Sequence, residues 1–280
     1  MLPTSEAIKP IIAPATVLKA GTLLLLGLWA GKALVGMNEI AGQLCLTLMI
    51  AFQLYVPYTL LQRKGLNPEN EGLHVHGLIL GPIAGFRKWV VYGLKEKRLW
   101  RFVFIKPIRQ WLAYHGRHAA LRPTPLLHDL KRVMLLVLIT FPPFAIGHHF
   151  FQIHVGGHSQ GFAFQLPPDL FVFVIFQILL VALPEELFYR GFMLVSLNKS
   201  WPNKTYILGI PIGRAVIISS LFFALAHFVG EYNILRLGPF FPAFLFSYLM
   251  LKSQSLFGAI SYHALSNIFS QILFVGYQAS

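Results

Sequence analysis

Two adjacent glutamates and an arginine interrupt a long apolar stretch. Glu185, Glu186 and Arg190 lie between the apolar runs 170–183 and 192–197. Charged groups at membrane depth cost roughly several kcal/mol unless they are paired, so by default they mark a functional site. Arg190 follows Glu186 by four residues, which predicts an ion pair on one helix face. Glu185 projects about 100° away, which leaves it as the free carboxylate, suited to act as a general base.

Two further apolar stretches carry polar residues one helical turn apart. Phe223 and His227 form one such pair, His263 and Asn267 form another, and Gln271 lies one turn further on. A single histidine in a helix is more often a satisfied core residue than a catalyst. Two histidines at membrane depth, together with paired glutamates, instead predict a shared acid–base site.

The three motifs together resemble those of the CPBP proteases. This family includes the type II CAAX prenyl endopeptidases and bacteriocin-processing or immunity (Abi-like) proteins. Its motifs EExxxR, FxxxH and HxxxN match Glu185-Glu186-x-x-x-Arg190, Phe223-x-x-x-His227 and His263-x-x-x-Asn267, in that order. The resemblance covers residues 170–275, whereas residues 1–165 carry no matching motif.

The resemblance implies an intramembrane endopeptidase that uses a glutamate to activate water. Carried over to this chain, Glu185 is the base and His227 orients the water. His263 and Asn267 then donate hydrogen bonds to the developing oxyanion, which is chemistry that such donors perform well in a dry site. The substrate implied is a membrane-anchored peptide or protein, which is cut in a processing reaction.

A zinc site is the closest alternative. Glu185, His227 and His263 are the ligand types of a His₂Glu catalytic zinc, and the family was long described as metal-dependent. The sequence has no HExxH motif, which would place two histidine ligands one turn apart on one helix. We therefore expect a reaction that needs no metal or other cofactor.

Two alternatives come from other functional classes. Buried polar groups also serve membrane transporters and proton relays, but here they concentrate in one C-terminal cluster, without inverted repeats. A non-catalytic immunity or binding member of the same family is the other alternative. All three motifs are complete, which favours the enzyme.

The composition predicts an all-α polytopic membrane protein. Hydrophobic residues make up 56% of the chain and charged residues 12%, about half the charged fraction typical of soluble domains. We expect a bundle of about seven transmembrane helices, near residues 17–37, 40–61, 133–151, 168–197, 207–229, 238–252 and 255–276. Pro184 is expected to kink or re-aim its helix just before the glutamates.

The predicted spans place the two histidines at different depths. If 207–229 crosses the bilayer once, His227 falls near its far end. His263 would lie only about two turns into its own helix. Staggered helices, or a short dipping segment at 238–252, would bring the two residues level.

Basic charge is concentrated in one part of the chain. Of the 23 Lys and Arg residues, 14 lie between Arg63 and Arg132. Basic clusters beside membrane spans mark the cytoplasmic side and its anionic lipids, so we expect no nucleic-acid partner. The region 62–132 and the N-terminus are predicted to face the cytoplasm from the cell (inner) membrane, with 86–112 on the membrane surface.

We expect one integrated domain with two parts. Residues 1–165 would carry N-terminal membrane helices and the basic region, and residues 166–280 the catalytic membrane region. Cys45, which has no possible disulfide partner within the chain, is predicted to be a small buried hydrophobe. His148, His149, His154 and His158 are predicted to be interfacial polar residues rather than metal ligands.

Overall fold

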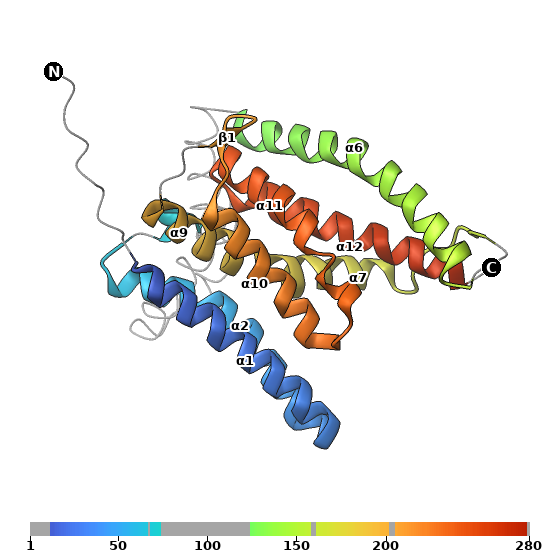
Figure 1. Ribbon diagram of the computed structural model, residues 1–280, viewed down its shortest axis with the longest axis horizontal. Helices are drawn as coiled ribbons and strands as arrows, with labels where there is room; N and C mark the ends of the chain where they lie inside the picture. The colour runs from blue at the N-terminus through green and yellow to red at the C-terminus, as the bar shows by residue number, and fades with distance from the viewer. Residues whose placement is uncertain (1–11, 67, 74–123, 158–160, 202–204, 279–280) are drawn as a thin grey trace, which may run out of the picture.

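The computed structural model describes residues 12–66, 68–73, 124–157, 161–201 and 205–278, most of which are helical (Figure 1). Six helical segments are long and apolar enough to cross a membrane. The prediction of an all-α polytopic membrane protein is therefore confirmed. Most of the basic region 62–132, including the predicted surface segment 86–112, lies outside the described residues, as does His158.

Seven long helical segments account for the predicted spans. Six of them are α1 (Pro14–Met37), α2 (Glu39–Arg63), α6 (Thr124–His154), α10 (Arg214–Glu231), α11 (Phe240–Ser253) and α12 (Leu256–Gln278). The seventh is a composite helix made of α7 (Leu170–Phe176), η2 (Gln177–Ala182), α8 (Leu183–Glu186), η3 (Leu187–Leu194) and α9 (Val195–Ser200). Short 3₁₀ turns, η1 (Pro68–Glu71) and η4 (Ile234–Leu237), adjoin α2 and α11.

Helix α12 differs from the others in its polarity. It is 23 residues long, yet it is not among the six segments that are apolar enough to cross a membrane by composition. Its sequence carries six uncharged polar residues or histidines in its middle part: Ser261, His263, Ser266, Asn267, Ser270 and Gln271. The polar residues in and around the HxxxN motif thus lower the hydropathy of α12.

A small β-hairpin replaces the start of one predicted span. Strands β1 (Tyr206–Ile207) and β2 (Ile210–Pro211) pair antiparallel, so the predicted span 207–229 was wrong at its N-terminal end, and α10 begins at Arg214. Leu208 and Gly209 both have positive φ, 52° and 77°, as a two-residue type I′ turn requires.

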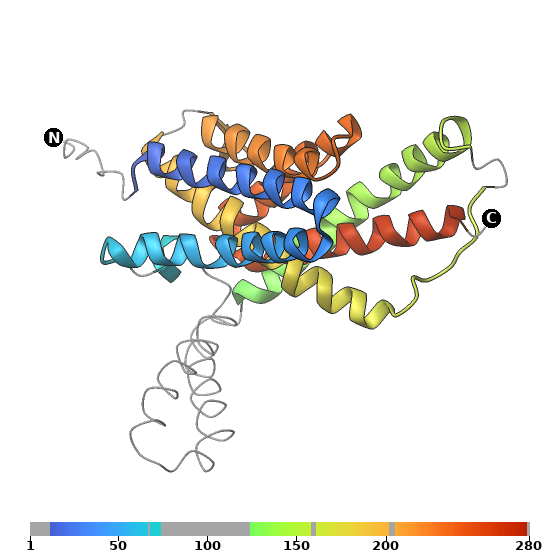
Figure 2. The ribbon, with the colours of Figure 1, turned by 90° about the horizontal axis from the view of Figure 1, so that it is seen from below.

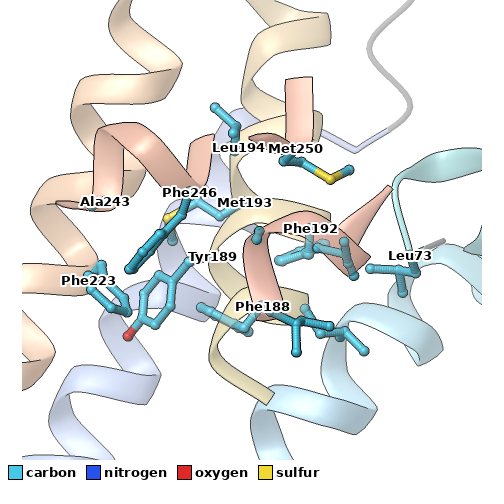
Figure 3. Close-up of a cluster of buried hydrophobic side chains, with 14 of the residues drawn as sticks. Leu73, Phe188, Tyr189, Phe192, Met193, Leu194, Phe223, Ala243, Phe246 and Met250 are labelled. Carbon is cyan, nitrogen blue, oxygen red and sulfur yellow. The ribbon is translucent and has the colours of Figure 1, made fainter. Parts of the chain in front are cut away.

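The second half of the composite helix lies inside the bundle, whereas α7 has no buried residue (Figures 1 and 2). Every residue of η3 is buried, and η3 contacts α1, α2, α10, α11 and α12. Its aromatic side chains pack together with Leu73 and with the rings of α10 and α11 (Figure 3). By contrast, α1, α2 and α6 expose large apolar side chains outward, as lipid-facing helices do.

Two π-helical segments flank the glutamates. Leu183 N–H donates to Ile178 O, five residues back, and η3 continues the wide turns after Glu186. Between them lies Pro184, which has no N–H to donate to the preceding turn. Wide turns change the helical phase and are frequent at functional sites. The predicted disturbance at Pro184 therefore takes the form of π turns on both sides of α8.

At one end of the bundle, two lysine side chains link neighbouring elements. Lys199 Nζ lies 2.5 Å from Glu71 Oε2, which ties α9 to η1. Lys252 Nζ donates to Leu208 O at 3.2 Å, which ties α11 to the hairpin. In Figure 1, α9 and β1 lie at this end, and the C-terminus lies at the opposite end.

The segment after η1 rests directly on the backbone of the central helix. Gly72 has φ +104°, and a Cβ added there would lie 2.6 Å from Gly191 O. A Cβ at Gly191 would in turn lie 2.7 Å from Leu73 Cδ2. Both glycines are needed for this close approach, because neither neighbour leaves room for a side chain. The contact lies one residue after Arg190.

We predict that Gly72→Ala destabilises the fold more than Gly65→Ala. Gly65 also has positive φ, +71°, but a Cβ there would meet no heavy atom within 4 Å. Gly65→Ala therefore reports backbone strain alone, about 1–2 kcal/mol, and Gly72→Ala adds the clash with Gly191 O. Thermal unfolding of the purified protein in detergent measures both variants. Equal shifts in Tm would show that the close packing on Gly191 contributes nothing.

Candidate active site

Helix α8 positions the two glutamates differently. Glu186 is completely buried, whereas the Glu185 side chain keeps 21% of its surface accessible. Consecutive helical residues project about 100° apart, so one carboxylate faces the bundle interior and the other faces a more open side. This difference in exposure agrees with the separate roles predicted for the two residues.

Glu186 and Arg190 form the predicted ion pair inside the bundle. Arg190 Nη1 donates to Glu186 Oε1 at 3.0 Å, and both side chains are fully buried. The guanidinium carbon lies 4.1 Å from the Phe223 ring centroid and 4.9 Å from that of Phe246. The cation is therefore held by a carboxylate and by two aromatic rings, which attract it through their quadrupoles.

His263 lies between the two carboxylates. Its Nδ1 is 2.8 Å from Glu186 Oε1, and its Nε2 is 3.8 Å from Glu185 Oε2. The ring stacks on Phe246, with centroids 4.8 Å apart and an interplanar angle of 13°. An ionised carboxylate only accepts hydrogen bonds, so Nδ1–H donates to Glu186. Nε2 is then directed toward Glu185.

His227 makes its contacts with Phe223 rather than with the glutamates. Its Nδ1 is 2.9 Å from Phe223 O, and its ring lies 4.6 Å from that of Phe223. In the part of the chain that the structure describes, His227 has no hydrogen bond or ion pair with either glutamate. The Phe223 ring also contacts His263, whose ring centroid is 5.6 Å from that of Phe223.

Both histidines lie beside the same aromatic ring. The Phe223 ring centroid is 4.6 Å from that of His227 and 5.6 Å from that of His263. Helix α10 begins at Arg214, and α11 forms a helix of its own at 240–253. The expected difference in depth between the two histidines stays a prediction.

Asn267 contacts a residue that the sequence analysis did not single out. Its Nδ2 donates to Gln177 Oε1 at 2.9 Å, which joins α12 to η2. Gln177 is the only polar residue between Leu170 and Ala182. A lone carboxamide in an apolar membrane run was the signal that could have revealed it.

Several buried polar atoms near the glutamates remain available for new hydrogen bonds. Among the described residues, no hydrogen-bond partner is found for Glu185 Oε2, Glu186 Oε2, Tyr189 Oη, or Arg190 Nε and Nη2. Buried polar groups are nearly always satisfied in proteins, by protein, water or ligand. These atoms all lie within residues 185–190, so this stretch is equipped to bind a polar group.

The zinc alternative gains no support from these positions. No set of three or more His, Cys, Asp or Glu side chains suited to holding a metal ion occurs within the described ranges. The Nδ1 of His263 contacts Glu186 and that of His227 contacts Phe223 O, which leaves both Nε2 atoms without these partners. Among the described residues, the donors predicted for zinc, Glu185, His227 and His263, are thus not gathered into such a set, and the reaction without a metal stays a prediction.

His148, His149 and His154 lie in the last two turns of α6. His149 Nδ1 is 2.6 Å from Tyr277 Oη, and His148 Nε2 is 3.2 Å from Gln152 Nε2. The His154 ring stacks on Phe150. Of these three contacts, only that of His149 joins α6 to α12, the other two lie within α6, and none of the three involves the glutamates. Cys45 is half-buried and reduced.

We predict that breaking the buried ion pair strongly destabilises the protein. Arg190→Met leaves the Glu186 charge buried without its cation, which costs about 3–5 kcal/mol in comparable pairs. The double variant Glu186→Gln with Arg190→Met removes both charges, so we expect it to regain part of the lost Tm. The control is Arg236→Met, which breaks an exposed pair with Glu231 and should cost about 0–1 kcal/mol. Unfolding of Arg190→Met at the wild-type temperature would contradict a stabilising role for the Glu186–Arg190 ion pair.

Comparison with known proteins adds an independent observation. Residues 167–269 match the family model described as type II CAAX prenyl endopeptidase Rce1-like. No curated protein and no solved structure matches the chain. The matched residues include both glutamates, Arg190, the two histidines and Asn267. The C-terminal membrane helices of this chain are therefore similar to the Rce1-like type II CAAX prenyl endopeptidases, which are intramembrane proteases.

Proposed function

We propose that this protein is an intramembrane endopeptidase that cuts a peptide bond of a membrane-associated substrate with water activated by Glu185. The observation that carries this proposal is the position of the Glu185 carboxylate. Its Oε2 has no hydrogen-bond partner in the described part of the chain, and it lies 3.8 Å from His263 Nε2. A carboxylate so placed is free to take a proton from water.

In the proposed reaction Glu185 takes one proton from water, and the water oxygen forms a bond to the scissile carbonyl carbon. The carbonyl oxygen becomes an oxyanion. Glu185 then gives its proton to the amide nitrogen, the carbon–nitrogen bond breaks, and an amine and a carboxylic acid leave. General acid–base catalysis of this kind contributes about 10²- to 10⁴-fold in rate.

His227 is suited to orient the water. A backbone carbonyl is only an acceptor, so the hydrogen bond to Phe223 O places the His227 proton on Nδ1. Neutral His227 then presents Nε2 as an acceptor. This atom would accept the second O–H of the attacking water, which fixes the direction of its lone pair.

His263 and Asn267 would stabilise the oxyanion. With Nδ1–H donated to Glu186, His263 offers a second donor only when Nε2 is also protonated. Asn267 Nδ2 carries two hydrogens, of which one is donated to Gln177. The other is available to the oxyanion, and loss of one such donor typically lowers kcat by about 10²- to 10³-fold.

In this proposal Glu186 and Arg190 position the catalytic groups and do not react themselves. Their ion pair fixes α8, and the Nδ1–H bond from His263 fixes α12 against it. We assign neither residue a proton transfer, because Glu186 Oε1 already accepts two hydrogen bonds. Their contribution is to hold Glu185 and His263 at a constant separation.

The substrate is proposed to reach the site from the bilayer or its cytoplasmic surface. The protein is an integral membrane protein, and Arg63, Lys199, Arg214 and Lys252 lie at the end of the bundle that holds α9 and the hairpin. Positive charge favours the cytoplasmic side, so we propose that this end faces the cytoplasm of a cell (inner) membrane.

Thiol labelling tests this orientation. In a Cys45→Ala background, a cysteine introduced at Lys199 should react with a membrane-impermeant maleimide only after the cells are opened. A cysteine at Gly157, beyond the other end of α6, should react in intact cells. The reverse pattern would invert the proposed topology.

We predict that Glu185→Gln abolishes cleavage without unfolding the protein. The amide cannot accept the proton from water, so kcat should fall about 10²- to 10⁴-fold. The assay uses purified protein in nanodiscs and a lipid-anchored peptide with a fluorophore and a quencher. Glu39→Gln, an exposed glutamate in the first turn of α2, is the matched control. Cleavage by Glu185→Gln at the wild-type rate would remove Glu185 from the mechanism, and ion flux in liposomes without any cleavage would favour a transporter.

The same assay tests the proposal that the reaction needs no metal. Dialysis against EDTA and 1,10-phenanthroline should leave the wild-type rate unchanged. Loss of cleavage that zinc restores would assign the reaction to a metal instead. In that case Glu185→Gln should also lose zinc, measured by its content in the purified protein.

A further inference from the structure

Gln177 is a polar residue in an apolar membrane segment. It begins η2 in an otherwise apolar run, Leu170–Ala182. A carboxamide in the membrane interior is unfavourable unless it is hydrogen-bonded. The identity of its partner therefore indicates what the residue does.

That partner is a residue of the HxxxN motif. Asn267 Nδ2 donates to Gln177 Oε1 at 2.9 Å, across 90 residues of sequence. Helices η2 and α12 are in contact, and Asn267 lies one turn after His263 on α12. Gln177 thus contacts one of the two proposed oxyanion donors, from a segment of the composite helix that precedes the glutamates.

The hydrogen bond constrains the direction of the second Asn267 donor. A carboxamide is planar, and its two N–H bonds leave the nitrogen at about 120° to one another. Once one N–H is directed at Gln177, rotation of the side chain is restricted and the other N–H has a fixed direction. Donors that are aligned before the reaction stabilise an oxyanion without reorganisation.

We propose that Gln177 is a positioning residue that holds the Asn267 carboxamide in the orientation needed to donate to the oxyanion. The inference rests on the proposed function, in which Asn267 is an oxyanion donor. A purely structural role, in which the bond only joins two membrane helices, predicts a loss of stability instead. The two roles differ in which measured quantity changes.

The test compares four variants in the peptide-cleavage assay: Gln177→Met, Gln177→Glu, Asn267→Ala and the double variant Gln177→Met with Asn267→Ala. Methionine keeps the length of glutamine and removes the acceptor. Glutamate keeps a carbonyl-type oxygen that can accept the Asn267 N–H. Gln62→Met is the control, because Gln62 also makes a side-chain hydrogen bond on a membrane helix, 2.8 Å to Tyr58 Oη, away from the site residues.

We expect Gln177→Met to lower kcat by about tenfold to a hundredfold, with KM within about twofold of wild type. Gln177→Glu should recover most of the lost rate, and Gln62→Met should leave kcat unchanged. In the Asn267→Ala background, Gln177→Met should have no further effect, because residues that act as a unit are not additive. Tm values measured in parallel identify any variant that is unfolded. If Gln177→Met is unfolded, the rate of Gln177→Glu is compared with that of the wild type instead.

Three outcomes would overturn the inference. The first is a wild-type kcat for Gln177→Met. The second is an equal fold-loss of kcat from Gln177→Met in the wild-type and the Asn267→Ala backgrounds. The third is a fall in Tm that accounts for the lost rate and that Gln177→Glu does not recover. A wild-type kcat for Asn267→Ala would instead overturn the oxyanion role within the proposed function. A loss caused by Asn267→Ala alone would leave that function intact and remove only the role of Gln177.

Discussion

A fully buried carboxylate needs donors, and in this protein the Glu186 carboxylate takes them from two helices. Arg190 donates from the next turn of the same helix and His263 donates from α12, both to the same oxygen. Burying an ion costs roughly several kcal/mol, which only well-placed partners offset. The relative position of the central helix and α12 is thereby determined, and with it the distance from Glu185 to His263.

Much of this arrangement could be predicted from the sequence. The four-residue spacing of Glu186 and Arg190 predicted the ion pair, because helix geometry alone brings such side chains together. Hydropathy predicted an all-α membrane bundle, because each span must satisfy its own backbone hydrogen bonds in lipid. The assignment of catalytic roles and the division at residue 165 remain predictions.

Other features depend on contacts that a single sequence does not display. The hairpin at 206–211 is an apolar run that reads like the start of a helix, and only its positive-φ turn distinguishes it. The π turns around Pro184 arise from packing as well as from the missing N–H. The bond between Asn267 and Gln177 joins residues whose spacing carries no periodic signal. The contact of one ring, that of Phe223, with both His227 and His263 is likewise a feature of the packing.

That ring belongs to Phe223, a residue with no polar atom in its side chain. It contacts the Arg190 guanidinium, the rings of His227 and His263, and the Tyr189 ring edge-on at 5.3 Å. One hydrocarbon surface therefore forms a shared wall for four polar side chains. The benzene face also places negative π-density beside the cation. The first position of the FxxxH motif is accordingly more than a hydrophobic filler, because its ring faces the cation of the buried ion pair and contacts both histidines.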